Sequence, residues 1–167
     1  MIYAGIGARK TPKEFLTYMN VLGQFMASEG HTLRSGGATG ADKAFEQGCD
    51  AQQGNKEIYL PWKGFNGNPS ELYGTTREAR ILAGEFHPNW PNVGPTGRDF
   101  MGRNCYQVLG QDLETPTNFV ICWTPNGKVI GGTGQALRMA NYYEIPVLNF
   151  GHHSLEEIEE AINSLKG

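Results

Sequence analysis

Three glycine-rich stretches carry the residues best suited to binding an anion. They are Gly5-Ile6-Gly7-Ala8-Arg9, Ser35-Gly36-Gly37-Ala38-Thr39-Gly40-Ala41-Asp42 and Gly131-Gly132-Thr133-Gly134-Gln135. Glycine has no Cβ, so a backbone rich in it can adopt positive φ and bring its N–H groups close to a ligand. A helix that begins directly afterwards adds free N–H donors and the positive end of its dipole. The three stretches therefore predict a phosphate or nucleotide site.

Side chains in these stretches extend the predicted site. The guanidinium of Arg9, which precedes Lys10, can clamp a phosphate through two parallel hydrogen bonds, and Asp42 can accept a hydrogen bond from a ribose hydroxyl. The alternative is that each stretch is only a tight turn between a strand and a helix, with Asp42 complementing the helix dipole. The candidate phosphate-binding residues of the three stretches are Gly5, Gly7, Ala8, Arg9, Ser35, Gly36, Gly37, Thr39, Gly40, Asp42, Gly131, Gly132, Thr133 and Gly134.

Established nucleotide motifs fit these stretches poorly. No Gly-Lys-Ser or Gly-Lys-Thr follows a glycine loop, which argues against a P-loop and ordinary ATP hydrolysis. Gly5-x-Gly7 lacks the third glycine of a dinucleotide fingerprint, and no acidic residue ends the second predicted strand. The glycines predict an anion site without specifying its ligand.

Aromatic and metal-binding residue types add less. Trp62, Trp90 and Trp123 are candidates for stacking on a base, although a buried structural indole is the commoner role of tryptophan. His87 could take part in acid–base chemistry, but no nucleophile partner is identifiable. The three cysteines are widely separated and His152-His153 are adjacent, so we expect no metal site. The sequence leaves the catalytic residues unknown and implies no cofactor.

Short apolar segments alternate with longer segments of helical periodicity. This alternation predicts an α/β fold, a Rossmann-like three-layer sandwich with a mainly parallel sheet of five or slightly more strands. In such sheets the ligand lies at the carboxyl ends of the strands. The predicted strands are 2–5, 31–34, 57–60, 119–123 and 146–150, and the predicted helices begin near 11, 41, 75, 98, 131 and 154. Thr11 is the expected N-cap of the first helix, and Ser154 with Glu157 is a capping box for the last.

Length and charge limit the function classes. The 167 residues suit one domain, residues 1–167, with an irregular excursion at 62–97 that is rich in Gly, Pro and Asn. Lys and Arg total 14 against 17 Asp and Glu, and the net charge of −3 argues against an electrostatic grip on duplex DNA. No apolar run approaches the ~18 residues of a membrane span, and the three unpaired cysteines suit a reducing compartment. We therefore expect a cytoplasmic protein.

The order of the motifs resembles the DNA-processing protein DprA (Smf) family. The similarity spans about residues 2–150 and implies membership of the wider SLOG group of Rossmann-like nucleotide-binding domains, which includes the lysine-decarboxylase-like LOG phosphoribohydrolases. Helical periodicity alone turns Arg103 to solvent, but its resemblance to the family's Arg-Asn helix implies that Arg103 and Asn104 belong to the site. The resemblance rests on Gly5–Arg9, on Ser35–Asp42 with Ala44 and Gly48, on Arg103-Asn104 with Leu109-Gly110, on Val120–Trp123, on Gly131–Thr133 with Ala136, and on Ile145–Val147.

One departure from the LOG enzymes bears on catalysis. Their Pro-Gly-Gly-x-Gly-Thr-x-x-Glu motif provides a glutamate for N-glycosidic cleavage, whereas the corresponding Gly131–Arg138 segment has none. A carboxylate is needed to stabilise or trap an oxocarbenium-like centre. The residues that could replace the missing glutamate are Glu14, Asp42, Glu46 and Asp99.

Three functions remain open. The first is a module that binds a nucleotide or nucleotide-sugar phosphate of the ADP-ribose type, as a sensor or sequestering agent. The second is an N-glycosidase or transferase of the LOG type that acts on a nucleoside phosphate. The third is single-stranded DNA binding in the manner of DprA, which the acidic charge makes the less favoured partner. The resemblance also implies a homo-oligomer, most simply a dimer, and the lack of a long apolar run predicts no membrane partner.

Overall fold

Five short strands form a parallel sheet in the computed structural model, which describes residues 1–166. Their order is β3-β2-β1-β4-β5, and every neighbouring pair is parallel. This confirms the Rossmann-like α/β prediction. Gly167, the last residue of the predicted domain, lies outside the described part. The strands are β1 Ile2–Gly5, β2 Thr32–Ser35, β3 Lys56–Ile58, β4 Phe119–Cys122 and β5 Val147–Asn149.

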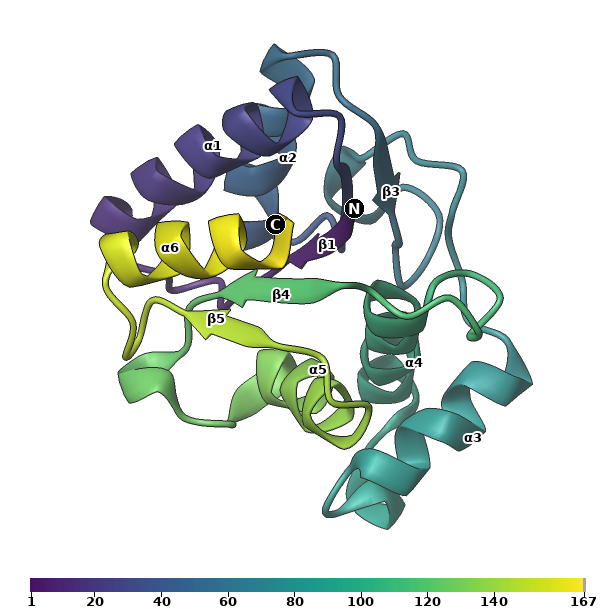
Figure 1. Ribbon diagram of the computed structural model, residues 1–167. Coiled ribbons are helices and arrows are strands. Elements are labelled where there is room, and N and C mark those ends of the chain that lie inside the picture. Colours follow the sequence, from purple (N-terminus) through teal and green to yellow (C-terminus); the bar gives the residue numbers. More distant parts are fainter. Residues whose placement is uncertain (167) are drawn as a thin grey trace.

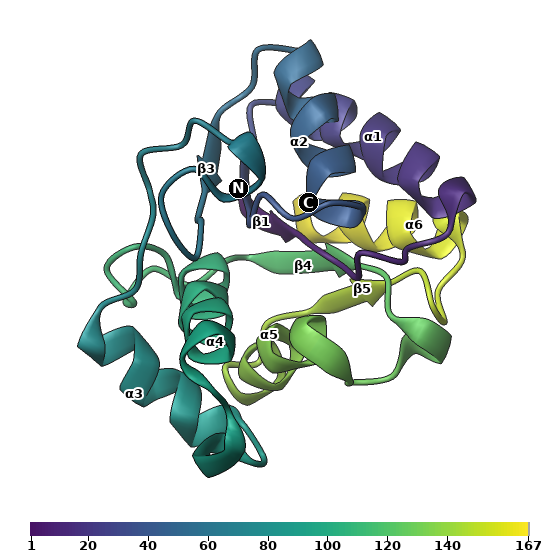
Figure 2. The ribbon, with the colours of Figure 1, turned by 180° about the vertical axis from the view of Figure 1, so that it is seen from behind.

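Helices cover both faces of the sheet (Figures 1 and 2). α1, α2 and α6 lie on one face, α4 and α5 lie on the other, and α3 packs on the outside of α4. The helices are α1 Lys13–Ser28, α2 Ala41–Ala51, α3 Arg77–Phe86, α4 Pro95–Leu109, α5 Gly131–Tyr142 and α6 Leu155–Lys166. None of the helices in residues 1–166 has the length and apolar character needed to cross a bilayer.

Alternation along the central strands fills the two cores. Tyr3 of β1 and Phe119 of β4 stack with 5.8 Å between ring centroids on the α1–α2 side. The next residues, Ala4 and Val120, face the core beneath α4 and α5. Gly5 ends β1 where a Cβ would lie 2.5 Å from the ring of Phe45 in α2. The glycine thus lets α2 pack closely over the carboxyl end of β1.

Element boundaries shift by a few residues where turn chemistry decides them. α1 begins at Lys13 rather than near Thr11, because the Thr11 hydroxyl donates back to the Ala8 carbonyl instead of capping the helix. α4 begins at Pro95, before the predicted start near residue 98, and ends before Gly110, whose φ is +80°.

Two helix starts were predicted well from local sequence. In α3, the Thr76 side chain caps the helix by accepting from the Ala79 N–H, close to the predicted start at residue 75. The capping box of α6 is confirmed, since Ser154 N–H donates to Glu157 and Glu157 N–H donates to the Ser154 hydroxyl. The 62–97 excursion, predicted to be irregular, contains α3, the first residues of α4 and two 3₁₀ turns, Phe65–Gly67 and Trp90–Asn92.

Candidate functional site

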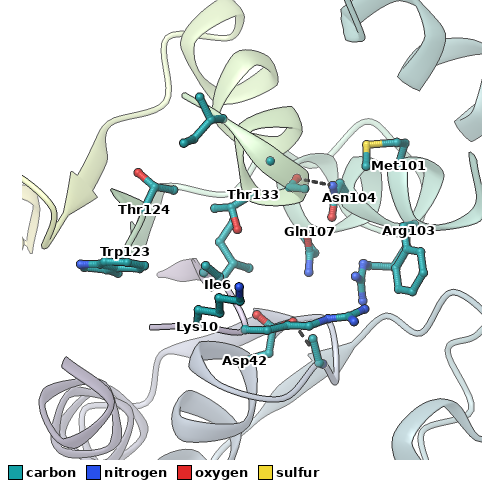
Figure 3. A pocket seen from close by; sticks show the side chains of 18 of the residues that line it. Ile6, Lys10, Asp42, Met101, Arg103, Asn104, Gln107, Trp123, Thr124 and Thr133 are labelled. Carbon is teal, nitrogen blue, oxygen red and sulfur yellow. Dashed lines mark hydrogen bonds between the residues drawn. The ribbon is translucent and has the colours of Figure 1, made fainter. Parts of the chain in front are cut away.

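A cleft of about 490 Å³ opens at the carboxyl ends of β1 and β4 (Figure 3). The strand order changes direction between these two strands, and a doubly wound sheet leaves a crevice at this switch point. Segments from both helical layers meet there. The lining consists of Ile6–Lys10 after β1, Ala38 and Asp42 around the start of α2, Gly97, Phe100, Met101, Arg103, Asn104 and Gln107 of α4, Trp123–Pro125 after β4, and Ile130–Thr133 at the start of α5.

The loop after β1 presents side chains to the cleft more than backbone amides. The Ile6 N–H donates to the Ile121 carbonyl and the Ala8 N–H to the Trp123 carbonyl, at 3.1 and 3.3 Å. Gly7 permits close contact with α2, because a Cβ there would lie 2.6 Å from the Cβ of Ala41. What remains for a ligand is the pair of exposed cations, Arg9 and Lys10, that follows the loop.

The loop after β2 is mostly structural. The Ser35 hydroxyl donates to the Gly5 carbonyl at 2.6 Å and links the ends of two strands. Gly36 lies under the side chains of Arg103 and Gln107, where any Cβ would overlap both. Gly40, with φ of +85°, packs its Cα against the backbone of the loop after β1. These glycines set how closely the elements approach one another.

Two predicted residues of this loop face elsewhere. Gly37 and Thr39 line a separate hollow of about 210 Å³, next to Glu46 and Asp50 of α2. Gly37 also has φ of +70°, and a Cβ there would lie 2.6 Å from the Leu60 side chain. Their place in the sequence motif therefore reflects the turn rather than contact with the main cleft.

The start of α5 is the part of the cleft richest in free backbone donors. Gly131, Gly132 and Thr133 form its first turn, which has no side-chain cap and no acidic residue. The first N–H groups of a helix have no partner within it, so they and the helix dipole favour an anion. The Asn104 amide donates to the Gly132 carbonyl at 3.0 Å and fixes this turn against α4.

Arg103 is buried, and the expectation from helical periodicity that it points to solvent was wrong. Only 6% of its surface is exposed, and its Nη1 donates to the carbonyls of Gly36 and Tyr59. Its Nε has no hydrogen-bond partner among residues 1–166. Burial lowers the pKa of Arg103, while the charge of Asp42 raises it. A guanidinium with an unused donor thus lines the cleft (Figure 3).

Phe100 holds two cations beside the cleft and was not identified from the sequence. The Cζ atoms of Arg9 and Arg103 each lie 5.5 Å from the centre of its ring. Cation–π attraction of this kind orients a guanidinium without using its N–H donors. The sequence pattern gave Phe100 only an apolar position on a helix, with nothing to distinguish a cleft residue from a core residue.

Asp42 is the one carboxylate lining the cleft among the described residues. It is 3% exposed, and burial raises its pKa to about 6, against the charge of Arg103 and a 3.3 Å hydrogen bond from the Ala38 N–H. The cleft therefore places three cations, Arg9, Lys10 and Arg103, around one carboxylate, although the whole chain is acidic.

The other three candidate carboxylates are placed away from the cleft lining. Glu14 is exposed on α1, where it accepts from the Tyr18 hydroxyl at 3.4 Å. Glu46 pairs with Lys56 at 2.9 Å. Asp99 accepts from the Thr75 hydroxyl at 3.3 Å. Of these four candidate carboxylates, Asp42 is the one that lines the cleft.

Of the three tryptophans, Trp123 lines the cleft and stacks on Phe15 of α1 with ring centroids 6.2 Å apart. Trp62 is 40% exposed and touches Phe100 from outside the cleft, with centroids 5.3 Å apart. Trp90 packs under the guanidinium of Arg98 instead.

The fold brings together about half of the predicted site. Among residues 1–166, no group of three or more His, Cys, Asp or Glu is arranged to hold a metal ion. The predicted residues that line the cleft are Gly7, Ala8, Arg9, Asp42, Arg103, Asn104, Trp123, Gly131, Gly132 and Thr133. Those that do not are Gly5, Ser35, Gly36, Gly37, Thr39, Gly40, Trp62, Trp90 and Gly134.

Comparison with known proteins gives a fold-level likeness. No family model matches the chain, and no curated protein matches its sequence. The chain is similar to a structure of DNA processing protein A from Helicobacter pylori, described for its unique single-stranded DNA binding mode, with 19% identity and a TM-score of 0.59. The match covers 89% of this chain and 64% of that one, so the chain spans less than two thirds of its length.

A second similar structure is that of the molybdenum cofactor carrier protein MCP from Chlamydomonas reinhardtii. It is 16% identical with a TM-score of 0.48, and the match covers 98% of this chain and 96% of that one. The likeness to the DNA processing protein A structure supports the Rossmann-like fold alone, and the function has to be argued from the site.

Proposed function

We propose that the cleft binds a nucleotide or nucleotide-sugar phosphate of the ADP-ribose type, and that the protein acts as a sensor or sequestering module. The main support for this proposal is Arg103, a buried guanidinium with an unpartnered Nε that lines a cleft where cations outnumber carboxylates. A buried donor without a partner costs free energy that a bound anion would recover. The cleft volume of about 490 Å³ is in the range of small-molecule sites.

The lining suggests how such a ligand would lie. Phosphate oxygens would be held by Arg9, by Arg103 and by the free N–H groups of the first turn of α5. A base would rest on the apolar part of the lining, where Trp123 offers a ring already supported from behind by Phe15. In this pose the ligand contacts residues from both helical layers.

Thermal unfolding with a small ligand panel tests the proposal. We expect ADP-ribose and AMP to raise the melting temperature and uncharged adenosine to raise it far less, because the site depends on phosphate contacts. Arg9→Gln should weaken binding by roughly tenfold, within the strength of a charged hydrogen bond. Lys13→Gln is the matched control, since Lys13 is an exposed cation that does not line the cleft. No stabilisation by any phosphorylated ligand would refute the proposal.

Single-stranded DNA is the second candidate, and the exposed Trp62 favours it. Trp62 touches Phe100 at the cleft wall and is followed by Lys63, so a base and a phosphate could continue outward from the cleft. The Helicobacter pylori structure described above is of a protein that binds single-stranded DNA. An oligonucleotide should then bind with steep salt dependence, and Trp62→Ala should weaken it. The absence of binding at low salt would remove this candidate.

We also infer that residues 1–167 form a single domain of the SLOG group and that it associates as a homodimer in the cytoplasm. Support comes from the order of the motifs and from the strand order found here. Light scattering tests the association. Release of free base from a nucleoside monophosphate would instead indicate the N-glycosidase alternative, for which Asp42 is the carboxylate available in the cleft.

A further inference from the structure

We propose that Asp42 takes up a proton when an anion binds in the cleft, so that ligand binding is coupled to pH through this one side chain. The inference rests on the proposed function, because it concerns the same cleft. It adds a dependence of ligand affinity on pH, which the identity of the ligand alone does not imply. The geometry behind it is a carboxylate enclosed with the cations that a phosphate would need.

Asp42 stands in the first turn of α2 with its side chain in the cleft lining (Figure 3). Its Oδ2 accepts from the Ala38 N–H, and the charge of Arg103 acts on it across the cleft. An anion that approaches the Arg103 guanidinium in the cleft therefore enters the field of a buried negative charge. Because Asp42 is only 3% exposed, water screens its charge poorly, and this charge repels such an anion.

Several elements place charged groups near Asp42. α4 contributes Arg103, the loop after β1 contributes Arg9 and Lys10, and Glu46 adds a weaker repulsion from within α2. The segments after β4 and at the start of α5 bring no titratable side chain to the lining, which there consists of Trp123–Pro125 and Ile130–Thr133. An anion in the cleft would be attracted by Arg9, Lys10 and Arg103 and repelled by Asp42, so Asp42 is the group whose charged form the anion would destabilise.

The free protein already holds Asp42 near the point of titration. Burial raises its pKa to about 6, and a bound phosphate would raise it further by repulsion. Above the free-state pKa, each ligand bound would then bring up to one proton with it. Affinity should rise as pH falls from about 8 to about 6, by at most about tenfold for each pH unit.

Calorimetric titration with ADP-ribose measures this directly. The pyrophosphate of ADP-ribose has no group that titrates near neutral pH, whereas a phosphate monoester such as AMP would confuse the result with its own pKa of about 6. The observed binding enthalpy should be measured near neutral pH in buffers with different ionisation enthalpies. Its slope against the ionisation enthalpy of the buffer should correspond to the uptake of a fraction of one proton. Asp42→Asn should still bind, with no proton uptake and with an affinity that no longer depends on pH.

Glu14→Gln is the matched control, because it removes an exposed carboxylate outside the cleft and should keep the proton uptake. NMR titration of the Asp42 carboxyl carbon in the unaltered protein gives a second measurement that needs no variant, and its pKa should rise when ADP-ribose is added. Binding with no proton uptake, or with an unmoved pKa, would overturn the inference while leaving the proposed function intact. The absence of binding at every pH would refute the proposed function and the inference with it.

Discussion

At the scale of single residues, the site depends on a ring as much as on charges. Phe100 lies 5.5 Å from the guanidinium carbons of both Arg9 and Arg103, so it holds an exposed and a buried cation at the same place. Two neighbouring cations repel each other, and attraction to the π face of a shared ring offsets part of that repulsion. The ring thus holds both guanidinium groups at the cleft in the free protein.

Replacing Phe100 by Leu should therefore reduce ADP-ribose affinity several-fold and lower the free energy of unfolding by about 1 kcal/mol, through lost cation–π and packing energy. Phe25→Leu is a suitable control, because Phe25 also has a cation over its ring, Lys166 at 4.9 Å, but lies on α1 away from the cleft. It should lower stability without changing affinity. Calorimetry and urea denaturation measure the two effects, and equal affinities for both variants would contradict the role given to Phe100.

Asp42 should also leave a signature in the stability of the free protein. Its folded-state pKa of about 6 lies above its ordinary value of 3.8, so the folded state binds the proton more tightly than the unfolded chain. Its contribution to stability is full below about pH 4, falls as pH rises to about 6, and is lost above that; the whole change is on the order of 3 kcal/mol. Denaturation across this range measures the free energy of unfolding of the protein and of Asp42→Asn. The difference between them should fall as pH rises from about 4 to about 6, and it should stay constant at higher pH.

At the scale of elements, α5 begins without a side-chain cap, as α1, α2 and α4 also do, but its first turn lines the cleft. The turn has no acidic residue and no capping side chain, in contrast to α3 and α6, which are capped by Thr76 and Ser154. Asn104 secures the Gly132 carbonyl and leaves the N–H groups unused. Under the proposed function these N–H groups would bind the anion, whereas in the free protein the missing cap is a local cost to the helix.

Thr133→Asp separates these two roles. A carboxylate in the first turn of α5 should stabilise the fold by roughly 0.3–1 kcal/mol through the helix dipole. The same charge should repel a phosphate and reduce ADP-ribose affinity by tenfold or more, since it removes an anion position. In Thr133→Asn the side chain is nearly isosteric with that of Thr133→Asp but carries no charge. This variant should change neither the stability nor the ADP-ribose affinity by much. A variant that is more stable and binds equally well would show that the ligand does not approach this helix.

At the scale of the whole molecule, the cleft joins the two helical layers across the end of the sheet. α2 comes from one layer and α4 and α5 from the other, and each contributes to the lining. A ligand held by all three should stabilise the whole fold rather than one loop. At a concentration of about 100 times its Kd, ADP-ribose should add about 2.7 kcal/mol. For a chain of this length the melting temperature should rise by roughly 5–10 °C, and amide hydrogen exchange should slow on both faces of the sheet.

Local chemistry and hydrophobic periodicity determined the class of fold and most helix starts. Apolar segments such as Phe119–Cys122 predict buried parallel strands because both their faces are covered, and the capping box at Ser154 acts within a single turn. Glycines after strands predicted correctly that a cleft would lie at the carboxyl edge of the sheet. These properties depend on residues close together in the chain, so the sequence by itself contains them.

Only the tertiary structure decided which of those residues face the cleft. The rotation of α4 about its axis buries Arg103, and this rotation depends on how α4 packs against the sheet and the loop after β2. The turn after β2 sends Gly37 and Thr39 to another hollow while Asp42 enters the cleft. Such choices depend on contacts between segments far apart in the chain, and no local pattern carries that information.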